Sequence, residues 1–482
     1  MVRVRIAPSP TGPLHIGTAR SALFNYLFAK QNKGKFILRV DDTDKERSED
    51  KYLKNLTVGL KDLGITWDEG IEMGGEFGPY KQSKRGEIYE KYLQQLLEEN
   101  KAYYCNCSKE KLDEARKKQI AEGKAQIYSG LCRDKNINKE EFPESVIRLK
   151  VDDKDVTFSD LIKGQQTIAT KEIGDMVIAK STKEVLYNFA SVVDDEEMKI
   201  SHVIRGEDHL SNTPKQILIM EALEFSVPHF GHIPLILNKD KSKLSKRKNK
   251  VSISDYLQEG FLPEALINYM VLLGWNPKNT EEFFTLEELG KEFNLTKVNK
   301  SGAIFDLERL RFFNAHYIKE MNLSKLTEMC LPYLIKKKLI AQPDSIENNK
   351  LENIIKIEQS RIEILSEVGD DVMFLFSDHL TYDPRFFLWK DMTKEDVIHG
   401  LEYMLKLLDS YEEKDFNNDF LQKNVVDRLK ADTENIGQVL WPLRIALSGQ
   451  KQSPSPFEIM EVYGKKESLK RVTAGIDLAK TL

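Results

Sequence analysis

Cysteine is scarce in this chain, with four among 482 residues. That number is too small for a disulfide framework, so we expect reducing surroundings. No apolar run approaches the roughly 20 residues that a membrane-spanning helix needs, and the Val–Arg alternation at the start is unlike a signal peptide. These absences argue against a secreted disulfide scaffold and an integral membrane protein, and they predict a cytoplasmic location.

A large excess of positive charge is also missing. The 72 lysines and arginines are outnumbered by 77 acidic residues, which gives a formal net charge of −5. Bulk charge therefore does not indicate nucleic-acid binding, and an RNA partner would have to be held by local basic patches. The length predicts about three domains, and the 40% hydrophobic fraction is enough to form their cores.

The opening stretch reads as a strand, a turn, a helix and a second strand. Residues 2–6 alternate apolar and basic side chains, and the prolines and glycine of 7–13 forbid regular structure. Helical spacing then predicts a helix that stops at Gly34, before a strand at 35–40. This order predicts a right-handed parallel crossover. Ligands bind at the carboxyl ends of such strands, where Gly17 would let a phosphate approach unpaired N–H groups.

Short motifs in a fixed order carry a family resemblance. The run Pro8–Gly12 precedes His15-Ile16-Gly17-Thr18, and Arg39–Asp44 closes the second strand. Far downstream, Lys243-Leu244-Ser245-Lys246-Arg247 lies in a stretch, 239–250, with seven basic residues and one acid. Together the motifs resemble those of class I aminoacyl-tRNA synthetases, in the form found in glutamyl-tRNA synthetases.

The resemblance implies a two-step reaction with ATP and Mg²⁺. A carboxylate is joined to the α-phosphate of ATP, and the aminoacyl group then passes to the 3′ end of a tRNA. Both steps depend on positioning and charge neutralisation. By resemblance, His15, Gly17, Lys243 and Lys246 are the catalytic residues. The ATP-binding residues implied are Pro10, Gly12, His15, Gly17, Thr18, Lys243, Ser245 and Lys246.

The amino acid implied is L-glutamate. Its side-chain carboxylate needs a cation, and its α-amine needs an anion; Arg5 and Arg205 lie at the ends of expected strands, where bidentate pairing is possible. Glutamine would leave a buried guanidinium without its counter-charge, so glutamate is preferred. Asp41 and Asp208 stand where glutamates are commoner in the family. The glutamate-binding residues implied are Arg5, Ala7, Ser9, Asp41, Tyr187, Arg205 and Asp208.

Three of the four cysteines fall within a short segment. Cys105, Cys107 and Cys132 suggest a structural Zn²⁺ site, and buried thiols are the alternative interpretation. Some members of the resembled family carry Cys-x-Cys followed by Tyr-x-x-x-Cys, as this chain does. Tyr128 or Asp134 would then supply the fourth ligand.

The resemblance covers essentially the whole chain and implies its organisation. We expect an α/β Rossmann-like parallel-sheet catalytic domain with an inserted α+β domain, followed by all-α anticodon-binding domains. The expected segments are 1–100 and 187–250 for the two catalytic halves, 101–186 for the inserted acceptor-binding domain, 251–322 for a stem-contact domain, and 323–380 and 381–482 for two anticodon-binding domains.

The tRNA partner leaves several hypotheses open. Arg361, Arg444 and Leu447 are the residues expected to contact the anticodon of tRNA(Glu), and the chain is expected to act as a monomer. One alternative is a non-discriminating enzyme that also charges tRNA(Gln) with glutamate. Another is an inactive RNA-binding relative, which the intact His15, Lys243 and Lys246 argue against. A glutaminyl enzyme would end in β-barrels, unlike the helical pattern after residue 323.

Overall fold

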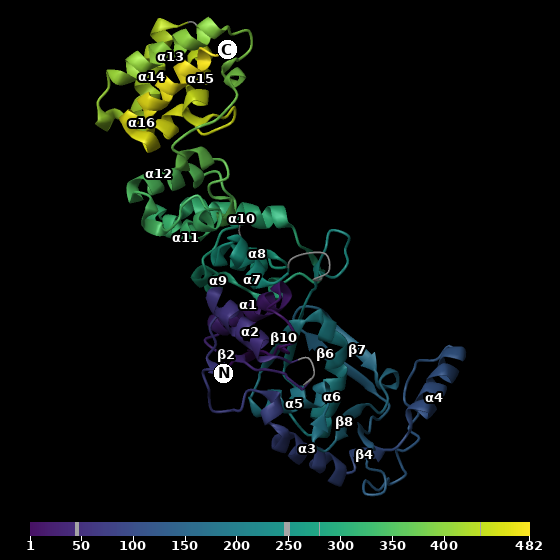
Figure 1. Ribbon diagram of the computed structural model, residues 1–482. Coiled ribbons are helices and arrows are strands. Elements are labelled where there is room, and N and C mark those ends of the chain that lie inside the picture. Colours follow the sequence, from purple (N-terminus) through teal and green to yellow (C-terminus); the bar gives the residue numbers. More distant parts are fainter. Residues whose placement is uncertain (44–47, 245–250, 279, 434) are drawn as a thin grey trace. The chain divides into compact units, whose positions relative to one another are not determined.

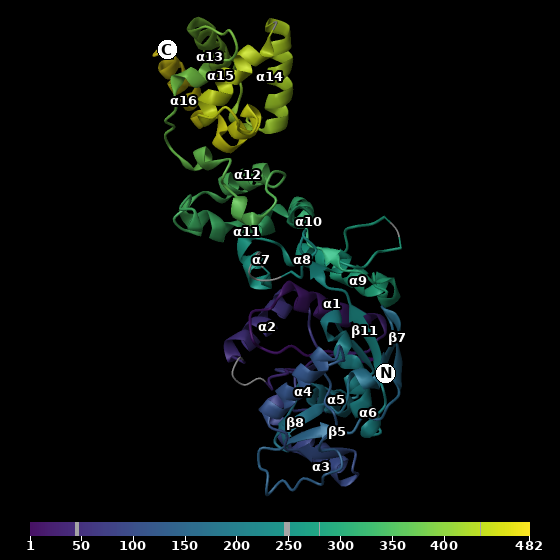
Figure 2. The same ribbon diagram turned by 90° about the vertical axis from the view of Figure 1, so that its right-hand side faces the viewer.

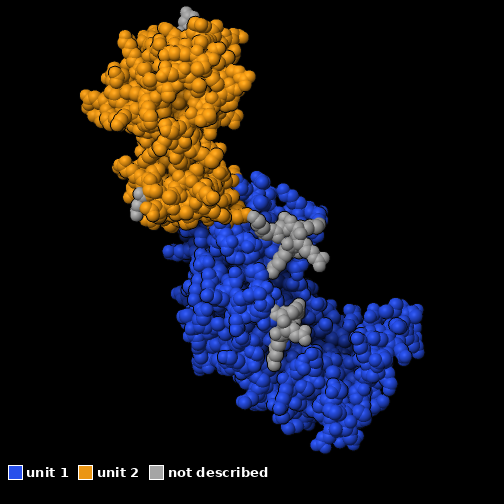
Figure 3. All heavy atoms as spheres, in the orientation of Figure 1, with its two compact units in different colours: residues 1–258, 262–313 blue, residues 259–261, 314–482 orange. Residues whose placement is uncertain are grey.

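A computed structural model describes residues 1–43, 48–244, 251–278, 280–433 and 435–482. The chain divides into two compact units (Figure 3). The N-terminal unit comprises residues 1–258 and 262–313, and the C-terminal unit comprises residues 259–261 and 314–482.

The N-terminal unit is built around a seven-stranded sheet (Figure 1). Its order is β3-β2-β1-β10-β11-β6-β7, and the neighbours are parallel except for the β6–β7 hairpin. β1 pairs with β2 in parallel, which confirms the predicted crossover. All four residues of β1 are buried, as is usual for a parallel sheet covered on both faces. The strands are Arg3–Ile6 (β1), Lys35–Leu38 (β2), Glu69–Gly70 (β3), Asp155–Asp160 (β6), Gly164–Ala169 (β7), His202–Gly206 (β10) and His229–Ile233 (β11).

The first helix, α1 (Ile16–Gln31), packs against β1 and β10. It ends three residues before Gly34, the stop that the sequence predicted, because Asn32 leaves helical geometry and Lys33 has φ +50°. Gly34 lies beside Val2, just before β2 begins, and a Cβ atom there would be 2.4 Å from the carbonyl oxygen of Val2. That glycine is therefore required by the close approach of the chain.

The remaining helices before residue 321 cover or flank the sheets. A capping box formed by Thr285 and Glu288 is present at the start of α9. The helices are Asp50–Asp62 (α2), Gly86–Glu98 (α3), Lys109–Ala121 (α4), Tyr187–Glu197 (α5), Thr213–Ala222 (α6), Ile253–Glu259 (α7), Pro263–Leu272 (α8), Leu286–Glu292 (α9) and Leu307–Glu320 (α10).

The segment 101–186, expected as a separate insert, contributes to two sheets. Four of its strands form an antiparallel sheet of order β4-β5-β8-β9. Its hairpin β6–β7 instead extends the parallel sheet, with Asp160 opposite Phe230 of β11. The segment thus completes the larger sheet as well as forming its own. The other strands are Ala102–Cys105 (β4), Val146–Leu149 (β5), Val177–Ser181 (β8), Glu184–Val185 (β9), Ile236–Leu237 (β12) and Ala303–Ile304 (β13).

The described part of the C-terminal unit is helical, without strands. Within it, α13, α15 and α16 pack against one another around an apolar core (Figure 2). None of the described helices in the chain is long and apolar enough to cross a bilayer. The helices are Leu323–Lys336 (α11), Asn348–Glu358 (α12), Lys394–Asp409 (α13), Asn418–Asp432 (α14), Ile436–Ser448 (α15) and Pro456–Ala479 (α16).

Glu358, at the end of α12, is a buried carboxylate with an incomplete set of partners. Its Oε2 accepts a hydrogen bond from the Gly369 amide at 2.8 Å, and among the described residues its Oε1 has no partner. Burial raises the pKa of Glu358 to about 7. The native state therefore holds a proton that the unfolded chain releases near pH 4.5, and stability falls as the pH rises through this window.

Glu358→Gln is expected to remove this pH dependence. At pH 5 both side chains are neutral and the two proteins should unfold at similar temperatures. At pH 8 the variant should be more stable by roughly 2–3 kcal/mol, because no buried charge forms. Thermal unfolding at the two pH values measures the difference, with the exposed Glu402→Gln as the matched control. Equal unfolding temperatures at pH 8 would contradict the burial of an ionised carboxylate.

Candidate active site

A cavity of about 440 Å³ opens where β1 and β10 end and α1 begins. This is the place at which a parallel crossover presents strand ends and helix N–H groups to a ligand. All seven residues expected to bind glutamate line it, together with four of those expected to bind ATP. They are Arg5, Ala7, Ser9, Asp41, Tyr187, Arg205, Asp208, His15, Gly17, Thr18 and Lys243.

The start of α1 is capped by the side chain of His15. Its Nδ1 accepts a hydrogen bond from the Gly17 amide at 3.0 Å, so Nδ1 carries no proton and the neutral ring is protonated at Nε2. A Cβ atom at Gly17 would lie 3.3 Å from this Nδ1, which is tighter than an ordinary contact. The pair therefore fixes which imidazole nitrogen can donate to a bound anion.

Arg205 is a buried cation without an acidic partner among the described residues. It is 5% exposed and lies at the end of β10. Its Nε donates to His232 Nε2 at 3.2 Å, and its Nη2 donates to Thr213 and Gln216 at 2.8 Å each. Its Nη1 has no hydrogen-bond partner in the described chain. Burial lowers the pKa of Arg205 to about 10, so the group stays charged near neutrality.

Arg5, in contrast, is already paired. Its guanidinium binds the Asp195 carboxylate in a bidentate manner at 3.1 and 3.2 Å. Arg39 donates to Asp195 at 2.6 Å and to Asp41 at 2.7 Å. Asp41, one of the residues expected to bind glutamate, lines the cavity. Both of its carboxylate oxygens accept hydrogen bonds from Arg39, so it forms a bidentate pair with that arginine.

A further buried carboxylate, Asp194, completes this group. It accepts hydrogen bonds from Arg85 at 2.6 Å, from Gln82 at 2.8 Å and from the Tyr89 hydroxyl at 2.9 Å. Arg39 lies 3.7 Å from the same carboxylate. The three arginines of the group thus face three aspartates, and their formal charges balance. The members are Arg5, Arg39, Arg85, Asp41, Asp194 and Asp195.

The lysine motif meets the cavity at one side. Lys243 forms an ion pair with Asp208 at 3.0 Å, and both side chains are about half exposed. Ser245 and Lys246 lie outside the described residues. Pro10 and Gly12 line a neighbouring cavity of about 180 Å³ that shares His15 and Thr18 with the first.

Several lining residues were not expected from the sequence. His209 accepts or donates a hydrogen bond with the Tyr187 hydroxyl at 3.1 Å, and burial together with Arg205 lowers the pKa of His209 to about 4. Arg20 is buried at the cavity wall and donates to the carbonyls of Leu273 and Pro234. Arg20 follows the motif that ends at Thr18, and His209 follows Asp208, an expected glutamate-binding residue, so proximity in sequence is the signal that could have found them.

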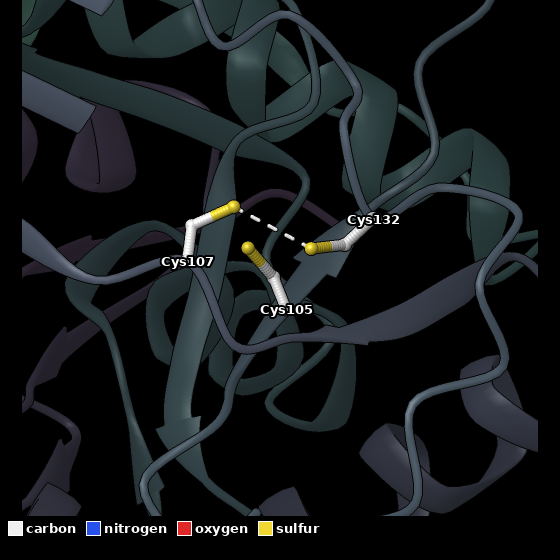
Figure 4. Close-up of side chains that lie close together, drawn as sticks. All are labelled: Cys105, Cys107 and Cys132. Atoms are coloured by element: carbon white, nitrogen blue, oxygen red, sulfur yellow. Dashed lines mark hydrogen bonds between the residues drawn. The ribbon is translucent and has the colours of Figure 1, made fainter. Parts of the chain in front are cut away.

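The three cysteines of segment 101–186 lie together (Figure 4). Their sulfur atoms are within 4.8 Å of one another. The Tyr128 hydroxyl approaches Cys105 Sγ at 3.3 Å and Cys107 Sγ at 3.5 Å, whereas Asp134 is exposed. Three thiols and a phenol oxygen around one point fit a tetrahedral zinc ion, and the geometry favours Tyr128 over Asp134 as the fourth ligand.

The residues expected to contact the anticodon all lie in the C-terminal unit. Arg361 is one-third exposed, and its Nη2 donates to both carboxylate oxygens of Glu458, at 3.0 and 2.9 Å. Arg444 donates to Ser453 Oγ at 3.2 Å and to the Pro454 carbonyl at 3.1 Å. Leu447 is 0% exposed, because it lies one helical turn after Leu443 on the inward face of α15. Its side chain therefore packs in the core of this unit.

Two family models match the chain. The model described as "tRNA synthetases class I (E and Q), catalytic domain" covers residues 1–312, and the model described as "Anticodon binding domain" covers residues 325–476. The parallel sheet and the cavity at its carboxyl edge agree with this class. Fold and site together define a class I tRNA synthetase.

Relatives and solved structures match over the full length. Glutamate–tRNA ligases from Carboxydothermus hydrogenoformans and Thermoanaerobacter pseudethanolicus are 42% and 43% identical, and the alignments cover 98% and 99% of this chain and 99% and 98% of theirs. The crystal structure of a glutamate tRNA ligase from Elizabethkingia meningosepticum, in complex with its amino acid, has a TM-score of 0.88 at 32% identity and 99% coverage of both chains. The chain belongs to the glutamate–tRNA ligase family.

Proposed function

We propose that the chain activates L-glutamate with ATP and transfers it to the 3′ end of tRNA(Glu). The observation that supports the specificity for glutamate is Arg205, a buried guanidinium that lines the cavity and has no acidic partner among the described residues. An unpaired buried cation is unfavourable until an anion binds it. The side-chain carboxylate of glutamate supplies that anion, and the neutral amide of glutamine does not.

The remaining contacts follow from the same cavity. Asp41, which lines the cavity, is the acid we assign to the α-amine of glutamate. Arg39 binds both Asp41 and Asp195, and Asp195 in turn holds Arg5. Tyr187 closes the wall beside His209. In activation, an α-carboxylate oxygen of glutamate forms a bond to the α-phosphorus of ATP, and the bond from that phosphorus to pyrophosphate breaks.

The ATP phosphates are assigned to the start of α1 and the lysine motif. His15 would donate from Nε2 to a phosphate oxygen, because its Nδ1 is occupied by Gly17. Lys243 would exchange its ion pair with Asp208 for the phosphates, and Lys246 is assigned by its motif alone. Mg²⁺ bound to ATP would share the charge on the departing pyrophosphate.

For tRNA, we assign segment 101–186 to the acceptor end and the C-terminal helices to the anticodon. Arg361 and Arg444 are the proposed anticodon contacts, each of which would have to leave a present partner. Leu447 would contribute only by supporting α15. We further propose that the chain acts as a monomer in the cytoplasm.

The test is ATP–pyrophosphate exchange with glutamate and glutamine run in parallel, with tRNA present. Glutamate should support exchange and glutamine should be weaker by several kcal/mol, since it leaves the guanidinium uncompensated. Aminoacylation of purified tRNA(Glu) and tRNA(Gln) then distinguishes a discriminating enzyme from one that charges both. Absence of exchange with either amino acid would favour the inactive RNA-binding alternative.

We also propose that Cys105, Cys107, Cys132 and Tyr128 hold a structural zinc ion. Metal analysis of the purified protein after dialysis should find about one zinc per chain, because thiolate ligands retain the ion. Cys132→Ser should lose it, whereas Cys330→Ser, which changes a buried thiol in the C-terminal unit, should keep it. A dialysed protein that is folded and free of zinc would end this proposal.

A further inference from the structure

Behind the cavity lies a buried carboxylate–imidazole pair that none of the recognised motifs contains. Asp160 ends β6 and His232 lies on the adjacent strand β11, and both side chains are 0% exposed. The Asp160 Oδ2 and His232 Nδ1 atoms are 2.6 Å apart. Neither residue lines the cavity, but His232 touches Arg205, which does.

The hydrogen bonds around Asp160 determine the state of the imidazole. Asp160 Oδ1 accepts from the backbone amides of Ile162 at 2.9 Å, Lys163 at 2.7 Å and His232 at 3.2 Å. Although burial alone would raise it, these bonds and the His232 contact keep the pKa of Asp160 below its usual value, so Asp160 is ionised. An ionised carboxylate only accepts, and Nδ1 of His232 must therefore carry the proton.

That tautomer leaves His232 Nε2 with a lone pair. This Nε2 atom lies 3.2 Å from Arg205 Nε and accepts a hydrogen bond from the Nε–H group. Burial lowers the pKa of His232, which keeps the ring neutral. The other groups that hold Arg205, Thr213 and Gln216, are neutral as well.

We infer that Asp160 and His232 are positioning residues for amino-acid recognition, because they fix the neutral imidazole tautomer that orients Arg205 without cancelling its charge. The contrast with Arg5 explains the arrangement. Arg5 is held directly by the Asp195 carboxylate and so is already neutralised as a pair. A carboxylate bound directly to Arg205 would weaken its attraction for a substrate anion in the same way. Asp160 instead acts through the imidazole of His232. Arg205 therefore keeps its orientation, and its positive charge stays available to bind glutamate.

This inference rests on the proposed function, and Asp160→Asn tests it at a single atom. The asparagine oxygen can still accept from the three backbone amides, so the amide nitrogen takes the position of Oδ2 and faces His232. That nitrogen donates to Nδ1, and the imidazole proton moves to Nε2, where it opposes the Arg205 N–H. The KM for glutamate in tRNA-dependent pyrophosphate exchange should rise about 10- to 100-fold, the range expected when one hydrogen bond to a charged group is lost.

The matched variants separate positioning from folding. The KM for ATP and kcat should change by less than about threefold, and the thermal midpoint should stay within a few degrees of the wild type. Asp155→Asn, an exposed change on the same strand, should behave as the wild type. At position 232, His232→Gln places an amide oxygen near the Nε2 position and should keep glutamate binding better than His232→Asn, whose shorter amide reaches only Asp160.

Each outcome decides a different claim. If the wild type shows no glutamate-dependent exchange, the proposed function fails, and the role inferred for Asp160 and His232 fails with it. If the wild type is active and Asp160→Asn has an unchanged KM for glutamate, only the positioning role is overturned. Should Asp160→Asn fail to fold, the two His232 variants decide, and equal KM values for glutamate in both would overturn the inference.

Discussion

Replacing Arg205 with leucine should lower kcat/KM for glutamate by about 10²- to 10³-fold. Removing one partner of a desolvated charge pair costs about 2–5 kcal/mol, and here the lost partner is the cation that meets the substrate carboxylate. The KM for ATP should change little, because the phosphates are assigned to α1 and the lysine motif. Pyrophosphate exchange at varied glutamate and varied ATP, with tRNA present, measures both.

Stability distinguishes this effect from a folding defect. The leucine removes a buried charge with no acidic partner in the described chain, and this gain offsets the loss of the hydrogen bonds to His232, Thr213 and Gln216. The thermal midpoint should therefore stay within a few degrees of the wild type. Arg205→Lys keeps a charge but lacks the planar fork, so it should retain part of the activity. Unchanged glutamate kinetics in the leucine variant would remove Arg205 from the site.

Asp194→Asn is expected to destabilise the N-terminal unit by about 3–5 kcal/mol, the usual cost of leaving buried charges uncompensated. Asp194 is 0% exposed, and its carboxylate accepts from Arg85, Gln82 and Tyr89. The asparagine preserves volume but leaves the balanced group of three arginines and three aspartates with a net positive charge. The midpoint temperature of thermal unfolding should fall by roughly 6–15 °C.

Two comparisons show whether charge is the cause. Tyr89→Phe removes one neutral donor from the same carboxylate, so it should cost only about 1 kcal/mol. The exposed Asp153→Asn should leave the unfolding midpoint unchanged. A midpoint for Asp194→Asn equal to that of Tyr89→Phe would mean that the buried charges are compensated in another way.

The sequence predicted those parts of the site that are encoded in short, local patterns. The crossover of β1, α1 and β2 follows from alternation, a proline-rich turn and helical spacing, and it brings Arg5, Ser9 and His15 to one cavity. The end of β10 carries Arg205 and the start of α5 carries Tyr187 to the same cavity. Motif residues could be assigned because the topology of the fold fixes where strand ends meet.

The partners of these residues could not be predicted in this way. Arg5 meets Asp195 across 190 positions, and His232 meets Asp160 across 72. Such contacts depend on how elements that are distant in sequence pack together, a strand with helix α5 for Arg5 and Asp195 and two strands for His232 and Asp160, and no local pattern specifies them. Leu447 shows the same limit for a helix, since the family resemblance singled out the residue but only the packing of α15 shows that its side chain faces inward.

The hairpin β6–β7 has a consequence for attempts to build a smaller enzyme. A deletion that joins residue 100 to residue 187 would remove the segment 101–186, which was expected to be a separate insert, and would fuse the two catalytic halves. It would also strip two strands from the larger sheet and expose β11 as an unprotected edge, which invites aggregation. A truncation that spares the hairpin, cutting only within the antiparallel strands and α4, is the version that the topology permits.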